Sequence, residues 1–356
     1  MDGVTIFSLY DRISLFHELA PFLCSKHRRL FTFTDSPRFC LSGDGNRSII
    51  LVRQFLKPDR VDLEFLRRIR DKYRRVFFFN GNAGGGIPRL EVLPYVDALY
   101  AKALFKDRGL YKRELYGGEL YSDFYHREFG ASDPCDKKRA VVQDEGELAK
   151  LRLYWNIGVG KYPRRELGEK IGVLVARTAG LGGSGAFFAG TDRLPPAPER
   201  PRTIAVHARL EMVSKPSVAY QRRLILDTIQ DQPSFLTGRV SQRRYNGELS
   251  AAKITLSPFG WGELCLRDFE AVRAGSLLVK PDMSHLETWP DVFTAGETYV
   301  PFRWDCSDLI SVCGQYLVDE EARRRIASQA LIAYQEQLEK VESRLEAILE
   351  AMFTIR

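Results

Sequence analysis

The chain has 356 residues, of which 44% are hydrophobic and 28% charged, and its 53 Lys and Arg against 46 Asp and Glu give a formal net charge of +7. This is the composition of an ordinary globular protein, and it excludes a disordered chain, a collagen-like repeat and a coiled-coil rod. The charge is too small to indicate nucleic-acid binding, and it fits a protein that handles an anion such as a phosphate or rests near an anionic membrane.

The N-terminal stretch MDGVTIFSLYDRISLF carries acids before its apolar residues and has no basic region, so we predict that it is not a signal peptide. No apolar run approaches the ~18 residues that span a bilayer. The six cysteines form no C-x-x-C pair and are predicted to be reduced thiols. We therefore expect a cytoplasmic protein, and any membrane contact would be peripheral, at the inner face of the membrane.

In the first half, short apolar runs predict strands at Arg75–Gly81, Ala98–Leu104 and Ile171–Ala176, with a helix over Asp62–Tyr73. The main break in composition is Gly190–Arg202, GTDRLPPAPERPR, which has four prolines and few apolar residues. Because proline fixes φ and removes a donor, this segment is predicted to be a stiff, exposed linker.

After the linker, strands are predicted at Thr203–His207, Ala252–Leu256 and Ser276–Val279, and helices at Ser217–Gln230 and Leu264–Ala274. Continuous apolar runs suit parallel strands that are covered on both faces. The alternation of strands and helices in each half predicts an α/β protein with two doubly wound, Rossmann-like domains. The expected units are an acceptor-side domain at 1–190, a linker at 191–202, a nucleotide-binding domain at 203–318 and a long amphipathic helix at 319–356.

The last helix is predicted over Asp319–Phe353 and carries an apolar seam. Its members alternate spacings of three and four: Leu331, Tyr334, Leu338, Val341, Leu345, Ile348 and Met352. Packing on the chain's own domains is favoured because the repeat covers only about three heptads. A homodimeric coiled coil is the alternative, and the mixture of Glu with Lys and Arg on the opposite face argues against a membrane helix.

The most informative segment begins after the strand at Ala252–Leu256, where a glycine-containing turn leads into a helix and then a further strand. Gly260 and Gly262 allow a ligand to approach the backbone closely. The helix start offers free N–H groups, which favour phosphate. Arg267 and Glu270 share one face with Glu263, and a cation with a carboxylate there suits the phosphates and ribose of a nucleotide diphosphate.

The stretch SPFGWGELCLRDFEAVRAGSLLVKPDMSHLETWPDVFTAGETYVPF resembles the donor-binding half of GT-B glycosyltransferases. It is most similar to the CgeB-like group of family-1-type bacterial transferases and more loosely to exostosin-type domains. Upstream pieces, such as Tyr121–His126 and Trp155–Gly158, also look like that group, so the resemblance covers roughly residues 76–309. It implies two domains facing a cleft, with the last helix packing back across their junction.

The resemblance also implies roles for particular residues. Glu270 matches the glutamate that binds the donor ribose. Retaining members carry an earlier glutamate near the donor sugar, with seven residues between the two; Glu263 is the candidate catalytic residue here, although six residues separate it from Glu270. Arg209 and Lys215 match, at a spacing one residue longer, the pair that holds the diphosphate.

Three further donor-binding candidates follow strands of the second half: Ser257, Asp282 and His285. They join Arg209, Lys215, Gly260, Gly262, Arg267 and Glu270 in the predicted site. Trp261 could stack on a base or a sugar.

The chain has no Asp-x-Asp pair, so we expect a metal-independent mechanism with no cofactor other than the nucleotide sugar, which is the substrate. The Gly180–Gly185 run matches G-x-G-x-x-G, but the linker follows too soon for a βαβ unit, so a flexible loop is expected. The catalytic base should be a carboxylate or histidine of the first half. Its candidates are left open among Asp11, Asp35, Asp123 and His126.

The function expected from these features is transfer of a sugar from a nucleotide-sugar donor to a glycan, a lipid-linked molecule or another hydroxyl acceptor, in the synthesis of bacterial surface polysaccharide or envelope glycan. The alternative is a non-catalytic nucleotide-binding or scaffolding protein that forms a homodimer through its last helix. The nucleotide, the sugar, the acceptor and the stereochemistry are not specified by the sequence.

Overall fold

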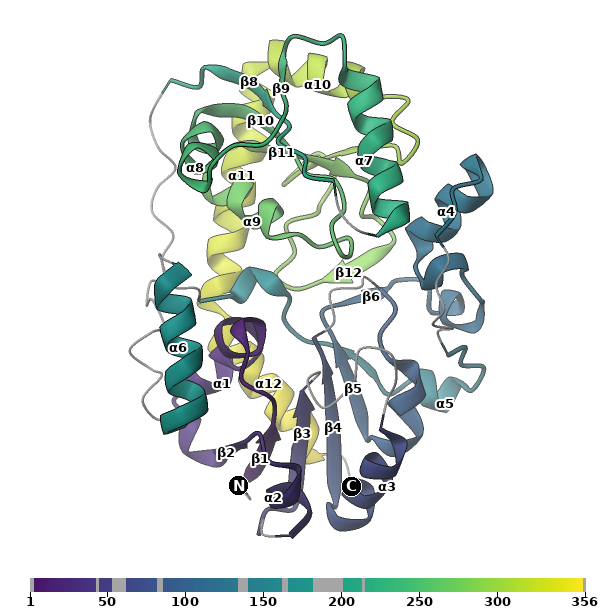
Figure 1. The fold of residues 1–356 in the computed structure, drawn as a ribbon, viewed down its shortest axis with the longest axis vertical. Helices are drawn as coiled ribbons and strands as arrows, with labels where there is room; N and C mark the ends of the chain where they lie inside the picture. Colours follow the sequence, from purple (N-terminus) through teal and green to yellow (C-terminus); the bar gives the residue numbers. More distant parts are fainter. Residues whose placement is uncertain are drawn as a thin grey trace.

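The computed structural model contains two parallel β-sheets, one in each half of the chain, and the last two helices run from one sheet to the other (Figure 1). It describes residues 3–42, 45–52, 62–81, 86–133, 140–161, 166–181, 201–212 and 215–354. The predicted linker lies outside the described residues except for its last two, Pro201 and Arg202. So do residues 182–185 of the glycine run.

Among the described residues, six strands form the N-terminal sheet in the order β2-β1-β3-β4-β5-β7, and every neighbouring pair is parallel. The strands are β1 (Val4–Phe7), β2 (Phe31–Thr34), β3 (Ser48–Val52), β4 (Arg75–Asn80), β5 (Ala98–Ala101) and β7 (Leu151–Leu153). Every residue of β1, β3 and β5 is buried. Burial on both faces explains why such strands form continuous apolar runs in the sequence.

Helices and helical turns connect these strands. They are η1 (Ser14–Glu18), α1 (Ala20–Cys24), η2 (Arg28–Leu30), α2 (Pro37–Ser42), α3 (Leu63–Lys72), η4 (Leu90–Tyr95), η5 (Arg108–Lys112), η6 (Tyr116–Gly118), α4 (Leu120–Phe129), α5 (Glu145–Leu148), η7 (Ile157–Val159) and α6 (Glu166–Ala179). The prediction of α3 is confirmed. Asp62 caps it by accepting a hydrogen bond from the Phe65 amide at 3.0 Å, and Leu66 and Ile69 are buried beneath it.

The C-terminal sheet has the strand order β13-β11-β10-β8-β9 and is also parallel throughout. Its strands are β8 (Ile204–His207), β9 (Phe235–Leu236), β10 (Ala252–Leu256), β11 (Leu277–Pro281) and β13 (Val300–Phe302). Its helices are α7 (Pro216–Ile229), α8 (Gln242–Ala251), α9 (Leu266–Arg273) and α10 (Leu309–Val318), followed by α11 (Glu320–Glu339) and α12 (Val341–Thr354). A small antiparallel sheet of β6 (Ala103–Phe105) and β12 (Leu286–Thr288) joins the two halves.

In each parallel sheet, the order in which successive strands are added reverses at one strand. β1 lies between β2 and β3, and β8 lies between β9 and β10. Such a reversal is the mark of a doubly wound sheet, and ligands bind beside it at the carboxyl ends of the strands. The predicted fold class is therefore confirmed: two Rossmann-like α/β domains with a long C-terminal helix, in the GT-B arrangement.

The C-terminal helix crosses from one domain to the other, as the resemblance implied (Figure 1). It breaks at Lys340, whose backbone angles of φ −90° and ψ 7° leave the helical region. Ile326 of α11 packs in the C-terminal core, whereas Leu345 and Met352 of α12 pack in the N-terminal core. The predicted seam thus packs on the chain's own domains, which is the favoured prediction, while dimerisation stays untested.

Two of the predicted strands are wrong in detail. The run Ile171–Ala176 lies inside α6, because a short apolar run suits a buried helix as well as a strand. The run Ala98–Leu104 is divided between β5 and β6 at Lys102, whose ammonium donates a hydrogen bond to the Gly81 carbonyl at 2.7 Å. Strands β1, β2 and β3 were not predicted at all.

Cys265, Cys306 and Cys313 are free thiols, in line with the prediction, while Cys135 lies outside the described residues. Within the described part of the chain, no helix has both the length and the hydrophobicity needed to cross a bilayer.

Candidate functional site

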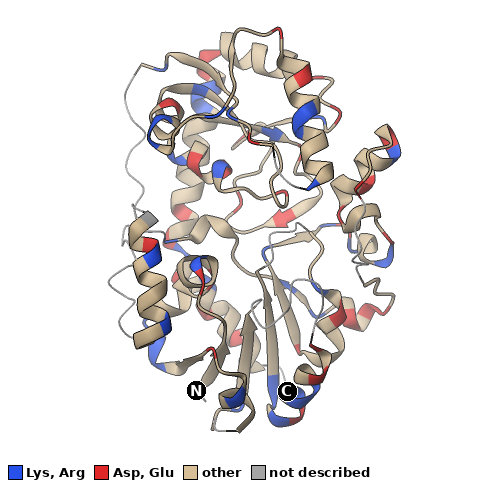
Figure 2. Cartoon of the chain, viewed as in Figure 1, with Lys and Arg blue, Asp and Glu red and all other residues tan. Residues whose placement is uncertain are grey.

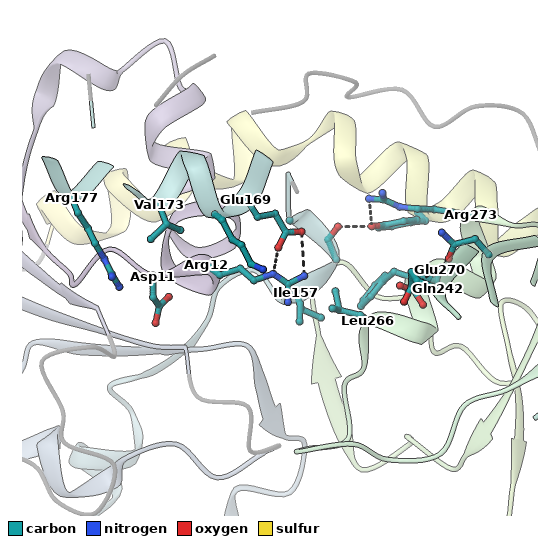
Figure 3. Close-up of a pocket in the computed structure, with 16 residues that line it drawn as sticks. Asp11, Arg12, Ile157, Glu169, Val173, Arg177, Gln242, Leu266, Glu270 and Arg273 are labelled. Atoms are coloured by element: carbon teal, nitrogen blue, oxygen red, sulfur yellow. Dashed lines mark hydrogen bonds and ion pairs between the residues drawn. The ribbon is translucent and has the colours of Figure 1, made fainter. Parts of the chain in front are cut away.

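A cavity of about 850 Å³ opens between the two domains (Figure 3). Its N-terminal side carries Asp11, Arg12, Glu169, Lys170 and Arg177. Its C-terminal side carries Gln242, Asn246, Leu266, Glu270 and Arg273. Basic and acidic side chains are interspersed here, as they are along both halves of the molecule (Figure 2).

Glu270 reaches this cavity from α9. The helix ends where the sequence predicted, because Gly275 adopts a φ of +65°, which glycine tolerates best. The Glu270 carboxylate accepts a hydrogen bond from the Tyr245 hydroxyl of α8 at 3.1 Å. Burial raises the pKa of Tyr245 to about 12, so its hydroxyl keeps the proton that it donates.

Arg267, one turn before Glu270, lies against the same tyrosine. Its Nε donates to the Tyr245 hydroxyl at 3.3 Å, and its Nη2 donates to the Arg209 carbonyl at 3.1 Å. Tyr245 therefore links Arg267 to Glu270, and of these two residues only Glu270 lines the cavity. The predicted pairing of a cation with a carboxylate on α9 is present, and it is mediated by a residue that the sequence analysis did not select.

Arg209 forms an ion pair with Glu248 and is not directed at the cavity. Its Nε and Nη2 donate to the two carboxylate oxygens at 2.8 and 2.7 Å. This hydrogen bonding lowers the pKa of Glu248 to about 2. His207 is fully buried beside the pair, with Nε2 3.7 Å from a Glu248 oxygen. A role for Arg209 in holding a diphosphate would require this bidentate pair to open.

Ser257 supports the fold and does not face a ligand, which corrects its predicted role. It is completely buried, and its hydroxyl donates to Asp268 at 2.5 Å. The same carboxylate accepts from the buried Lys280 ammonium at 3.1 Å and from the Cys265 amide at 2.9 Å. This network attaches the start of α9 to the end of β10. Removing one partner would leave a buried charge unpaired, which is strongly destabilising.

The glycine turn predicted at Gly260 and Gly262 is closed by a hydrogen bond from the first amide to the second carbonyl at 2.9 Å. Neither glycine has a positive φ. A Cβ at Gly260 would lie 3.0 Å from the Cys265 sulfur, so the small residue serves close packing of the turn. Trp261 between them is 61% exposed.

Glu263 and His285 lie together, at 3.6 Å between a carboxylate oxygen and Nε2, but neither lines the cavity that contains Glu270. Glu263 is fully buried, and its carboxylate oxygens have no hydrogen-bond partner among the described residues. Lys215 is nearby: its ammonium donates to the Tyr121 hydroxyl at 3.0 Å. The pKa of Tyr121 is raised by its burial first, and then by the nearby carboxylates of Glu119 and Glu263. Lys215 and Glu263 of the C-terminal domain therefore lie near Tyr121 of the N-terminal domain.

Asp282 lines a second cavity, apart from Glu270. Its carboxylate accepts from the Ser284 amide at 3.3 Å and from the Tyr299 hydroxyl at 3.4 Å. The structure therefore places Asp282 apart from Glu270, and its predicted role in donor binding stays a prediction.

Of the four candidate bases, Asp11 lines the interdomain cavity, where the Ser14 amide donates to its carboxylate at 2.7 Å. Asp123 is paired with Arg127 at 2.9 Å on α4. His126 is exposed and stacked on a tyrosine, and Asp35 is exposed after β2.

The cavity also contains residues that the sequence analysis missed. Gln242 and Asn246 line it and, four residues apart, lie on one face of α8; Tyr245 of the same helix does not line the cavity and reaches it through its hydrogen bond to Glu270. That spacing was visible in the sequence. The side chains that α6 places on the opposite wall of the cavity are brought there only by the tertiary fold. Tyr334 of α11 lies at the cavity wall, accepts from Arg273 at 3.1 Å and donates to the Gly158 carbonyl.

Among the described residues, one group of side chains has the chemistry and spacing to hold a metal ion. His27, Glu342 and Glu346 place one ligand atom each within 4.8 Å of the others. The group lies where α12 meets the loop after α1, and its residues line neither of these two cavities.

Residues 202–350 match the model of a family described as glycosyl transferase-like. This confirms the resemblance to family-1-type glycosyltransferases for that part of the chain, and it does not separate the CgeB-like group from the others. No curated protein matches the chain.

Solved structures match the chain at very low identity. The pneumococcal O-GlcNAc transferase GtfA, in complex with UDP and GlcNAc, is 10% identical with a TM-score of 0.45, over 89% of this chain and 60% of that one. T4 phage BGT with UDP-glucose is 11% identical with a TM-score of 0.47, over 98% and 99%. Anabaena Alr3699/HepE with UDP and glucose is 8% identical with a TM-score of 0.45, over 99% and 100%. The chain spans 54% of TarM and 60% of GtfA, little more than half of each.

Proposed function

We propose that the chain is a glycosyltransferase that moves a sugar from a nucleotide-sugar donor to a hydroxyl acceptor. The observation that carries the proposal is Glu270, held by Tyr245 on the wall of an interdomain cavity of about 850 Å³. A cavity of this size between two Rossmann-like domains fits a nucleotide sugar. The glycosyl transferase-like family match of residues 202–350 supports the same function.

In this proposal Glu270 accepts hydrogen bonds from the ribose hydroxyls. Gln242 and Asn246, which face it from α8, supply amide donors and acceptors for the nucleotide. Arg273 and the amino end of α9 offer positive charge to the diphosphate. With basic groups and a helix dipole in this role, the reaction is proposed to need no metal ion.

The acceptor is proposed to enter from the N-terminal side. Asp11 on that wall is positioned by the Ser14 amide and is proposed as the base that takes the acceptor proton. Glu263 is proposed to act with His285 in positioning the turn between β10 and α9, because both lie outside the cavity lining.

The proposed setting is bacterial surface-polysaccharide or envelope glycan synthesis, with peripheral membrane contact. Support for the contact comes from α6, where Leu167, Ile171 and Leu174 are 66%, 41% and 60% exposed along one stripe. Lys170 and Arg177 on the same helix suit anionic lipids. Co-sedimentation with phosphatidylglycerol vesicles should be lost in Leu174→Ser and kept in the exposed control Val318→Ser.

The central test is titration of UDP, GDP and CMP sugars into the wild type and Glu270→Ala. A thermal-shift screen selects the nucleotide first, since a ligand at 100 times its Kd adds about 2.7 kcal/mol to stability. We expect Glu270→Ala to weaken the selected donor by about 2 kcal/mol, roughly 30-fold, because ribose hydroxyls lose a charged acceptor. Glu297→Ala, which removes an exposed glutamate elsewhere, is the control. Equal affinity in both variants contradicts the assignment.

A second measurement separates an enzyme from a nucleotide-binding protein without catalysis. Released nucleotide and free sugar are followed with the selected donor, with and without acceptor candidates. Turnover by the wild type that is lost in Glu270→Ala supports the glycosyltransferase. Tight donor binding with no turnover under any acceptor condition favours the non-catalytic alternative.

A further inference from the structure

A second cavity, of about 460 Å³, lies between α4 and the C-terminal domain. Phe124, Glu128 and Phe129 form its α4 side. Asp282, Arg303, Trp304 and Asp305 form the other side. It shares no lining residue with the cavity that contains Glu270.

Three aromatic side chains in this cavity are held in fixed positions. Trp304 meets Phe124 edge to face at 5.3 Å between ring centres. Its indole N–H donates to the Asp282 carbonyl at 2.9 Å, and its own carbonyl accepts from Tyr125 at 2.9 Å. Phe129 stands at the rim and is 40% exposed, which is unusual for a phenylalanine at the end of a well-packed helix.

Carboxylates accompany these rings. Asp305 accepts from the Ser307 amide at 3.0 Å and hydroxyl at 2.7 Å, and Arg303 lies 3.5 Å from it. Glu128 is exposed on the α4 side, and Asp282 completes the set. Three carboxylates against one guanidinium make the cavity acidic, which disfavours a phosphorylated or uronic ligand.

We propose that this cavity binds a neutral saccharide. Aromatic rings offer flat apolar faces to the C–H faces of a sugar ring, and ionised carboxylates accept hydrogen bonds from its hydroxyls. A pocket of this volume, with apolar walls and a few oriented polar groups, is typical of a small-ligand site. A saccharide has both the apolar C–H faces that suit the aromatic rings and the hydroxyl groups that suit the carboxylates.

The saccharide site adjoins the residues predicted around the donor. The ring of Trp304 contacts the ring of His285 at 5.2 Å, and His285 lies 3.6 Å from Glu263. A saccharide against Trp304 would thus be one side chain away from that pair. Its identification as part of the acceptor glycan rests on the proposed function, whereas its binding does not.

Isothermal titration measures the binding directly, with cellotriose, mannotriose and chitotriose as neutral probes. Trigalacturonate serves as an anionic probe and choline as a cationic one, because an acidic aromatic cavity also suits a quaternary ammonium. The protein is the full chain, without nucleotide. We expect at least one neutral trisaccharide to bind, and neither charged probe to compete with it.

The matched variants are Phe129→Ala and Phe39→Ala, which remove phenylalanines of similar exposure, 40% and 37%, inside and outside the cavity. Phe129→Ala should weaken the trisaccharide about tenfold, as expected for a lost stacking partner, and it should still unfold cooperatively, with a thermal midpoint lowered by the loss of its contacts with Phe124, Tyr125 and Tyr220. Glu128→Gln should weaken it less. Phe39→Ala should have no effect.

Absence of binding by every neutral trisaccharide, binding that survives Phe129→Ala unchanged, or preferential binding of choline each overturns the inference. The donor titrations are read separately. If no trisaccharide binds while nucleotide binding is intact and depends on Glu270, this inference alone is refuted. Saccharide binding without nucleotide binding refutes the proposed transferase alone.

Discussion

The Tyr245 hydroxyl lies 3.1 Å from the Glu270 carboxylate and 3.3 Å from the Arg267 guanidinium. The helices that carry these residues lie on either side of β10 in the sequence, so the contact depends on the doubly wound sheet. It gives Glu270 a fixed direction at the cavity wall before a ligand binds. Side chains held in this way lose less conformational entropy on binding.

Tyr245→Phe removes the donor to Glu270 and the acceptor for Arg267. We expect the donor KM, or its Kd, to rise about fivefold to tenfold, the effect of one hydrogen bond to a charged group, with little change in stability. Donor titration and thermal unfolding measure the two quantities. Tyr316→Phe, on α10 and outside both cavities, is the control. An unchanged donor affinity would show that the tyrosine does not position Glu270.

Lys280→Met leaves the Asp268 carboxylate buried without its cation. Both side chains are fully buried and lie 3.1 Å apart. We expect the free energy of unfolding to fall by about 3–5 kcal/mol in urea denaturation. The double variant with Asp268→Asn should recover part of this loss, because the uncompensated charge is removed. A single variant as stable as the wild type would contradict the network.

His207 predicts a pH dependence of stability. Burial, assisted by Arg267, lowers the pKa of His207 to about 4 from its ordinary value of 6.5. The unfolded chain therefore binds this proton more tightly than the folded one. The stabilisation by neutral His207 is complete above pH 6.5 and is lost as the pH falls toward 4, by up to about 3 kcal/mol.

Urea unfolding at several pH values between 4 and 7 measures this effect. His207→Leu should show a shallower decline over that interval than the wild type, because the titrating ring is absent. Identical slopes for the two proteins would exclude His207 as the source.

Leu345→Ala tests the contact between α12 and the N-terminal core. Leu345 is completely buried there, although most of that core comes from the first half of the chain. We expect a loss of about 2–5 kcal/mol, the usual cost of a leucine-sized cavity. Val318→Ala, at a site 88% exposed, should change stability little. A mild effect at Leu345 would mean that α12 is only loosely attached.

The elements that could be predicted from sequence were those with an unbroken apolar run and a clear end. The strand β10 and the helix α9 are examples, since Gly275 marks the end of α9. The run Ile171–Ala176 failed because periodicity alone does not separate a short buried strand from part of a helix.

Part of the candidate site could be predicted from the spacing of residues within one helix. Glu270 and Arg267 lie on one helix, so their shared face follows from spacing. Ser257 and Arg209 follow strands as expected, but their partners Asp268 and Glu248 occupy them, and such pairings arise only from tertiary contacts. The sequence also gave no sign that Asp282 would line a separate cavity.

The position of α12 has a consequence for biosynthesis. Leu345, Ile348, Leu349 and Met352 close the same core as β1, yet they are translated after every strand of the N-terminal sheet. The first sheet therefore emerges from the ribosome with part of its apolar surface uncovered, and it stays prone to aggregation until α12 has been translated. Chains that terminate before Val341 should accumulate as insoluble material, even though every residue that lines the interdomain cavity would already have been made.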